Sequence, residues 1–302
     1  PPTLAMTVSV NNSPLAGRDG TKVTSRVLRE RLYKESEGNV AIHVNDTDQK
    51  DTFEVTGRGE LQLGVLIETM RREGYELSIS KPKVIFRYDE KTGKKLEPIE
   101  EVIIDVDENY TGAVVEKMGI RKGELQDMKP SSGGKQRIVF HAPSRGMIGY
   151  HGEFLTDTSG TGVMSRLFLK FSEYRGKLDT RKNGVLISID SGKAVAYSLW
   201  NLEERGHMFI SPGTDVYNGM IIGEHNRNND LDVNPLKNKQ LTNIRASGKD
   251  ESIRLTTPKI LTLEDAIAYI ETDELVEVTP SAIRLRKKLL LQHERKKAAR
   301  AN

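Results

Sequence analysis

The sequence contains no cysteine, and this absence excludes disulfides, thiolate nucleophiles and cysteine-based zinc sites together. No apolar run approaches the roughly 18 residues that a membrane-spanning helix needs. The chain starts at Pro1-Pro2-Thr3 without an initiator methionine, a basic region or an apolar region. We therefore expect no signal peptide, an excised piece of a longer protein, a cytoplasmic location and no membrane partner.

Charge is distributed unevenly along the 302 residues. The chain is 36% hydrophobic and 29% charged, which is enough to bury two or three cores of ordinary size. Its formal net charge is only +3, yet residues 281–302 hold eight Lys or Arg and a single acid, Glu294. The basicity is therefore concentrated at the C-terminal end, and a local basic segment favours a polyanionic partner.

Hydrophobic periodicity predicts a first domain over residues 1–95. Apolar residues alternate at Leu4, Met6 and Val8, which indicates a half-buried strand, while Leu63, Leu66, Ile67 and Met70 lie at helical spacing. The predicted order is strand, helix, strand, strand, helix, strand, over residues 3–10, 23–38, 40–44, 52–55, 63–74 and 75–80. This βαββαβ order predicts a ferredoxin-like domain with one uncovered sheet face.

A second domain, predicted over residues 96–176, repeats this order without similarity at the level of residues. Its expected elements lie at residues 101–106, 110–118, 124–128, 136–142, 147–155 and 166–171, where the second and fifth are helices. Residues 91–98, with the sequence KTGKKLEP, are expected to form a turn and linker between the two domains.

Residues 177–302 have a different pattern, which predicts a mostly-β third domain. Short strands expected at residues 184–189, 193–199, 206–210 and 219–224 suggest a small barrel or sandwich. Thr262 and Asp265 resemble a capping box at the start of a helix. A strand LVEV and a basic helix from Ser281 onward are expected to close the chain. Residues 226–249 carry few apolar side chains, so we expect a long functional or disordered loop.

Several long motifs resemble a known family. GRGELQLGVLIETMRREG (Gly57–Gly74) and KPKVIFR (Lys81–Arg87) resemble the third domain of translational GTPases. LEPIEEVIIDVDENYTGAVVEKMGIRKGEL and APSRGMIGYHGEFLTDTSGTG resemble the fifth, elongation-factor-G-type domain. VTPSAIRLRKKLL (Val278–Leu290) is similar to a C-terminal domain of the TypA/BipA family specifically. The resemblance covers essentially the whole chain and implies a ribosome-associated protein.

The family's nucleotide-binding signatures are absent from this sequence. Gly133-Gly134-Lys135 continues into Gln136 rather than Ser or Thr, so no phosphate-binding loop is present, and Asn238-Lys239 does not continue into the Asn-Lys-x-Asp motif. The resemblance therefore implies that GTP and magnesium are bound by an N-terminal domain outside this chain. We expect no enzymatic activity and no catalytic, cofactor or metal residue here. The Gly57–Gly59 turn could hold an anion, but Glu60 favours a plain turn.

Basic clusters are the remaining candidate sites. Arg121 and Lys122 follow a predicted helix, where contact with RNA phosphates and simple solvation are equally compatible with the sequence. The candidates in the long loop and in the basic tail are Lys237, Lys239, Arg245, Lys249, Arg284, Arg286, Lys287 and Lys288. A polar loop of this kind can fold onto RNA on binding, although disorder is the alternative.

The resemblance implies specific partners. These are the large ribosomal subunit and its ribosomal RNA, with the tRNA acceptor end as a further RNA partner, engaged by a monomer in ribosome assembly or stress-responsive translation. One alternative is a protein-interaction adaptor whose open sheets bind other proteins. Another is a small-molecule-sensing enzyme built from tandem ferredoxin-like domains, for which the sequence offers no polar site.

Overall fold

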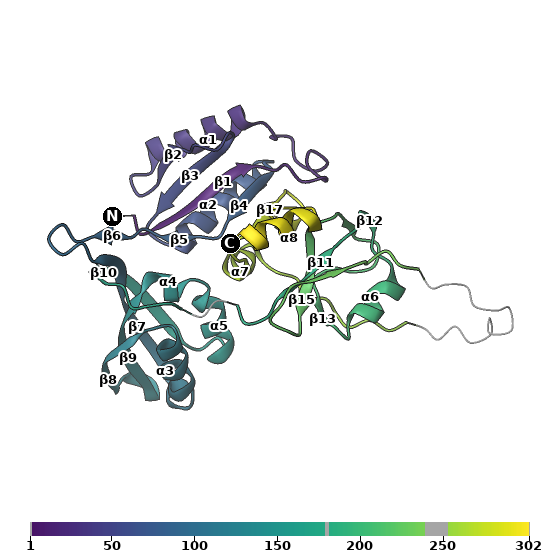
Figure 1. Cartoon of the computed structure of the whole chain (residues 1–302). Helices are drawn as coiled ribbons and strands as arrows, with labels where there is room; N and C mark the ends of the chain where they lie inside the picture. Colours follow the sequence, from purple (N-terminus) through teal and green to yellow (C-terminus); the bar gives the residue numbers. More distant parts are fainter. Residues whose placement is uncertain (1, 179–180, 239–252, 302) are drawn as a thin grey trace.

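The computed structural model describes residues 2–178, 181–238 and 253–301, and Figure 1 shows them as three units in chain order. In this part of the chain, strands form one eleven-stranded sheet, one five-stranded sheet and a small two-stranded sheet. Helices pack against the two larger sheets, so the chain is of the α+β class, as follows from the two ferredoxin-like domains and the mostly-β domain expected from the sequence. Within the described residues, no helix is long and apolar enough to cross a bilayer.

The first unit has the predicted βαββαβ order. Its elements are β1 (Leu4–Val10), α1 (Ser25–Gly38), β2 (His43–Asp46), β3 (Thr52–Gly57), α2 (Glu60–Arg72) and β4 (Leu77–Ser80). The strands are antiparallel in the order β4-β1-β3-β2, which is the split ferredoxin-like arrangement. Alternating Leu4, Met6 and Val8 are buried because they face α1 and α2, whose own apolar stripes complete the core.

The second unit repeats this topology around a separate core. After the short strands β5 (Lys83–Val84) and β6 (Arg87–Tyr88), its elements are β7 (Lys95–Asp107), α3 (Thr111–Ile120), β8 (Glu124–Pro130), β9 (Lys135–Pro143), α4 (Ser144–Met147), α5 (Tyr150–Asp157) and β10 (Val163–Glu173). Short 3₁₀ turns at Glu108–Tyr110 and Ser132–Gly134 precede α3 and β9. The strand order β10-β7-β9-β8 again matches the ferredoxin-like pattern.

Two details of the second unit differ from expectation. The single helix predicted over residues 147–155 is divided into α4 and α5, because Gly149 adopts a left-handed conformation with φ +74° between them. The predicted linker at residues 91–98 is shorter than expected. Its last four residues already belong to β7, which pairs with β6 through Arg87 and Leu96.

The third unit is mostly β, as predicted. Its elements are β11 (Val185–Ser188), β12 (Gly192–Lys193), α6 (Ala196–Leu202), β13 (Gly206–Met208), β14 (Asp215–Val216), β15 (Met220–His225), β16 (Leu231–Val233), α7 (Leu263–Tyr269), β17 (Glu274–Val278), β18 (Ile283–Lys287) and α8 (Gln292–Ala301). The capping box of Thr262 and Asp265 at the start of α7 is confirmed. The strand expected at residues 193–199 is mainly helical, because Leu199 and Leu202 reach the core at helical spacing.

The long loop is partly ordered into the sheet. Within the stretch 226–249, β16 pairs in parallel with β11, so the expectation of a stretch without regular structure is wrong for this part. The pairing is possible because Val233 packs into the core of the third unit, which gives the polar stretch one apolar anchor.

The position predicted for the C-terminal helix, from Ser281 onward, is also wrong. Residues 283–287 form strand β18, and the helix α8 begins only at Gln292. The segment IRLRK alternates with a period of two, and β17 beside it carries acids at matching positions. Glu277 lies opposite Arg284 and Glu274 lies opposite Lys287, so cross-strand charge pairs favour the strand.

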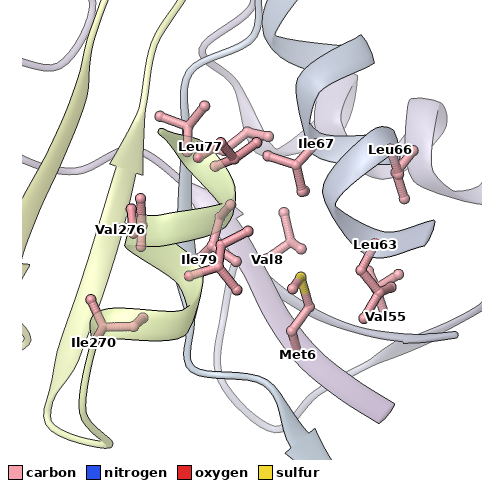
Figure 2. Packing of buried hydrophobic residues seen from close by; sticks show 14 of the residues in the cluster. Met6, Val8, Val55, Leu63, Leu66, Ile67, Leu77, Ile79, Ile270 and Val276 are labelled. Carbon is pink, nitrogen blue, oxygen red and sulfur yellow. The ribbon is translucent and has the colours of Figure 1, made fainter. Parts of the chain in front are cut away.

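The first and third units share one sheet. Strand β17 pairs with β4 in an antiparallel register, so the order β16-β11-β15-β18-β17-β4-β1-β3-β2 runs through both units. Figure 2 shows Ile270 and Val276 of the third unit packing toward Ile79 of the first unit in one buried cluster. Because this seam is made of paired backbone and fully buried apolar side chains, the two units form one rigid platform.

A loop after β1 strengthens this seam from the other face. Leu15 of the first unit packs into the core of the third unit. Ser13 Oγ donates to the buried carboxylate of Glu277 at 2.6 Å, and Asn11 Nδ2 donates to the carboxylates of both Glu76 and Glu277. Since each buried carboxylate has polar partners, the loop is held in a defined position.

Candidate nucleic-acid interface and interdomain junction

The predicted pair Arg121 and Lys122 separates into one structural and one exposed residue. Arg121 Nη1 donates to the carbonyl of Gly146 at 2.8 Å, and its Nη2 lies 3.0 Å from the Glu153 carboxylate. The guanidinium also covers the ring of Tyr150, so this side chain holds the end of α3 against α4 and α5. Lys122 is exposed in a turn with φ +63°, and its ammonium is available to a partner.

The candidates of the long loop are only partly within the described residues. Lys237 is exposed and directly follows Leu236, which packs against the core of the third unit. The backbone that presents Lys237 is therefore anchored. Lys239, Arg245 and Lys249 lie outside the described residues, and their RNA contacts stay a prediction.

Two candidates of the basic tail are buried in the sheet. Arg286 and Lys287 are 4% and 2% exposed. Lys287 Nζ lies 2.9 Å from carboxylate oxygens of Asp273 and Glu274, and 2.6 Å from Asp230. Burial disfavours the charged ammonium, but these carboxylates outweigh it and raise the pKa of Lys287 above its usual value. The expectation that Arg286 and Lys287 contact RNA is therefore corrected, because both belong to the interior.

The remaining tail candidates differ in accessibility. Arg284 Nη1 donates to Glu277 at 2.9 Å, and its side chain is mostly buried. Lys288 is exposed as a residue, and its ammonium reaches the carbonyl of Thr272. Burial of the ammonium, followed by repulsion from Lys83, lowers the pKa of Lys288. Of the tail candidates, only Lys288 therefore keeps an exposed position.

Helix α8 carries a further group of cations that the sequence analysis did not select, of which Lys296, Lys297 and Arg300 are exposed. None of the residues of this helix is buried, and its cations are Arg295, Lys296, Lys297 and Arg300. The signal that could have found them is the absence of large apolar residues from 292–301, in contrast to the alternating apolar residues of β18.

The GRGE turn has a role between domains. Glu60 is the first residue of α2, and its carboxylate accepts a hydrogen bond from the backbone amide of Gly149 at 2.8 Å. The same carboxylate lies 3.1 Å from Arg166 Nη1, while Arg166 Nε donates to Glu100 at 2.7 Å. The carboxylate of Glu60 is therefore engaged by the second unit, and the choice of a plain turn over an anion site at Gly57–Gly59 stays a prediction.

The third unit joins the same junction through α7. A Cβ atom added at Gly149 would lie 2.6 Å from the Cβ of Ala268. The turn between α4 and α5 therefore fits closely between the start of α2 and the side of α7. Figure 1 shows α4, α5 and α7 gathered at this point, where all three units meet.

The uncovered face of the second sheet is not suited to stacking bases. On it, Ile103 lies opposite Val139 and Glu101 lies opposite Leu167. Leu167 and Val163 are both 60% exposed. RNA-binding sheets present aromatic and basic side chains, whereas the centre of this face is aliphatic.

A cleft of about 880 Å³ opens between α2, residues 260–264 and strands β15 and β18. Its lining includes the buried residues Ile221 and Leu285 and contains no histidine or cysteine. Glu68 also lines the cleft. Burial raises the pKa of Glu68, but Arg72 and Arg71 outweigh burial and hold it below its usual value. Such a carboxylate stays ionised, so it does not act as a proton donor near neutral pH. Among the described residues, no group of three His, Cys, Asp or Glu could hold a metal ion.

Comparisons with known proteins agree with these domains. The family model for the elongation factor G C-terminus matches residues 94–182, and that for the TypA/BipA C-terminal domain matches residues 183–292. Proteins named large ribosomal subunit assembly factor BipA are 55% identical over 300 residues in Haemophilus influenzae, 51% over 301 residues in Escherichia coli K12 and 49% over 300 residues in Bacillus subtilis.

These alignments cover 99% of this chain. The chain spans about half the length of these relatives, with 48% of the Haemophilus protein and 49% of the other two covered. Both family models match in the order expected from the sequence, and the similarity extends over all three units of the structure. The chain belongs to the TypA/BipA family.

Proposed function

We propose that this chain is the ribosome-binding portion of a TypA/BipA protein and that it contacts ribosomal RNA of the large subunit. One observation carries the proposal: relatives 49–55% identical over 99% of the chain are named large ribosomal subunit assembly factors. In this reading the chain contributes binding surface and geometry, and no catalytic residue. GTP and magnesium would be bound in the half of the relatives' length that this chain does not span.

The distribution of cations supports an RNA partner. Arg121 and Lys287 are engaged inside the protein, whereas Lys122 and Lys237 are exposed on separate units. Exposed cations can replace the counterions of phosphates, and this exchange provides most of the sequence-independent affinity for RNA. The interface we propose therefore consists of separated cations on a rigid framework, with the tRNA acceptor end as a second RNA partner.

The framework supports transmission of a signal between domains. The first and third units share a sheet, and the second unit is joined to them at Glu60, Gly149 and Ala268. A movement imposed on the first unit would therefore carry the third unit with it and change the angle of the second. We propose that a cytoplasmic monomer uses this geometry during ribosome assembly or stress-responsive translation.

A salt titration tests the proposed RNA contact. Binding of the 302-residue chain to purified large subunits is measured at increasing KCl concentration. We expect the logarithm of the affinity to fall linearly with the logarithm of salt, by about 0.7 to 0.9 units of slope per phosphate contact. Binding without salt dependence would overturn the RNA contact and favour the adaptor function, for which the exposed Val163 and Leu167 offer a docking face.

A further inference from the structure

The C-terminal helix α8 is fixed to the body of the protein along one side. Arg295 pairs with Asp232 of β16, and Gln292 Nε2 donates to the same carboxylate at 2.8 Å. Arg295 also donates to the carbonyl oxygens of Leu289 and Leu290, which precede the helix. These contacts orient the helix even though none of its residues is buried.

The opposite side of α8 carries a stripe of basic residues. His293, Lys296, Lys297 and Arg300 follow the spacing i, i+3, i+4 and i+7, which places them on one face of a helix. All four residues are exposed. We call these four residues (His293, Lys296, Lys297 and Arg300) the α8 stripe. Arg295 lies on the opposite side of the helix, so its contact with Asp232 directs the stripe away from the body of the protein.

The charges of the stripe are not neutralised by the protein. Across the described ranges 2–178, 181–238 and 253–301, no carboxylate forms a salt bridge with Lys296, Lys297 or Arg300, whereas Arg295 is paired. The helix contains one acid, Glu294, which lies beside the stripe rather than within it. Like charges held at one-turn spacing repel each other, so this arrangement costs free energy until an anion binds.

We propose that the α8 stripe binds the phosphate backbone of ribosomal RNA, independently of base sequence. The stripe extends for about 10 Å along the helix, and one strand of a duplex places about three phosphates over such a length. The inference rests on the proposed ribosomal function and adds a contact to it. The stripe lies beyond residue 292, where the match to the TypA/BipA C-terminal domain ends.

The composition of α8 argues against other partners. A helix that lies on a membrane needs large apolar residues opposite its cations, but the apolar residues of α8 are Ala298, Ala299 and Ala301. The centre of a protein interface is enriched in aromatic residues and depleted in lysine, and the stripe has the reverse composition. An RNA backbone, which needs only positive charge at suitable spacing, fits this surface.

The test is a triple charge reversal, Lys296→Glu, Lys297→Glu and Arg300→Glu, in the full 302-residue chain. The matched control is Lys34→Glu, Lys50→Glu and Lys91→Glu, which changes the net charge equally at exposed positions of other elements. Affinity for purified large subunits is measured from about 50 to 200 mM KCl. We expect the α8 variant to lose about two units of salt slope and at least tenfold in affinity at the lowest salt, and the control to lose clearly less.

The outcomes separate this inference from the proposed function. If the unmodified chain binds with a steep slope and the α8 variant keeps that slope, the stripe is a solvated surface and the inference is overturned. If the unmodified chain does not bind large subunits, the proposed ribosomal function is contradicted. The inference that α8 binds ribosomal RNA is then contradicted as well, because it rests on that function. Thermal melting of both variants should stay at the unmodified value, because α8 buries no residue. Replacing the same three residues by Gln provides a second variant, which should show the same loss in weaker form.

Discussion

The carboxylate of Glu60 accepts a hydrogen bond from the backbone amide of Gly149, 89 positions further along the chain. This bond joins the start of α2 to the turn between α4 and α5. Because Glu60 opens the helix, its negative charge also lies at the favourable end of the helix dipole. Two motifs that carry the family resemblance, GRGE and SRGMIGYHGE, therefore meet at one interdomain contact.

Replacing Glu60 with Ala should loosen this contact. The substitution leaves the Gly149 amide without its acceptor and removes one of the two carboxylates of Arg166. We expect the free energy of unfolding to fall by about 1–3 kcal/mol, as measured by urea denaturation. Amide exchange at Gly149 should also become faster. Glu30→Ala, which removes an exposed pair with Arg26, is the control and should change stability by less than about 1 kcal/mol. Equal effects of the two substitutions would contradict the assigned junction.

Gly149→Ala should destabilise the chain for two separable reasons. The residue has φ +74°, which an L side chain rarely adopts, and the new Cβ would lie 2.6 Å from the Cβ of Ala268. We expect a loss of at least about 1–2 kcal/mol from the backbone alone, with the clash added to it. Adding Ala268→Gly should recover the part due to the clash and leave the backbone part, as read from melting temperatures. No recovery in the double variant would mean that α7 does not press on this turn.

The sequence predicted the elements whose signal is local. These elements depend only on residues that are close together in the sequence. Examples are the alternation in β1, the apolar stripe of α2 and the capping box at Thr262. Both ferredoxin-like orders followed from such signals. The pairing of β4 with β17 could not be predicted in this way, because LSIS and ELVEV are short runs that carry no information about each other's register.

The candidate site was harder to predict, because accessibility of a charge depends on its distant partners. The sequence places Lys287 in a basic tail, but in the structure Glu274 lies directly opposite it in β17. A signal was present in the sequence. The acids of ELVEV and the cations of IRLRK are arranged to face each other across a short turn, which is the pattern of a charge-paired hairpin. The local density of positive charge does not reveal this pairing, and it therefore suggests that the cations are free to bind a partner molecule.

Lys287→Met should be strongly destabilising, although the residue lies in a basic segment. The substitution removes the ammonium that three carboxylates share, and Glu274 is fully buried beside it. Breaking a buried ion pair from one side costs about 3–5 kcal/mol, because the remaining charge loses its partner. Denaturant unfolding would measure this loss. A change below about 1 kcal/mol would mean that Lys287 is hydrated, and would return it to the candidates for RNA contact.

The free energy of unfolding should depend on pH through the carboxyl group of Glu274. Burial raises the pKa of this carboxyl, but Arg181 and Lys287 outweigh burial and hold it below its usual 4.5. A depressed folded-state pKa contributes stability above the unfolded value, and this contribution is lost as pH falls through the folded value. The free energy of unfolding should therefore decline below about pH 4.5. Glu274→Gln should show a shallower decline over the same range, and an unchanged slope would assign the acid sensitivity to other carboxyls.

Arg121 and Lys122 provide a matched pair of neighbouring cations with opposite expected roles. Lys122→Glu should leave the melting temperature unchanged, because the side chain is exposed and exposed charges contribute little to folding. It should weaken binding to large subunits and reduce the salt slope by close to one unit, since one phosphate contact is removed. Arg121→Glu should instead lower the melting temperature, because it breaks the contacts with Gly146, Glu153 and Tyr150.

Conservative variants decide which property of each side chain matters. Arg121→Lys keeps the charge but loses the planar group that covers Tyr150, so stability should fall while charge-driven binding is preserved. Lys122→Arg keeps the charge of an exposed residue and should preserve both stability and binding. If Lys122→Glu binds large subunits with the unmodified affinity and slope, Lys122 is merely solvated. The RNA contact of the second unit would then have to be sought elsewhere on its surface, because Arg121 is already engaged by the fold.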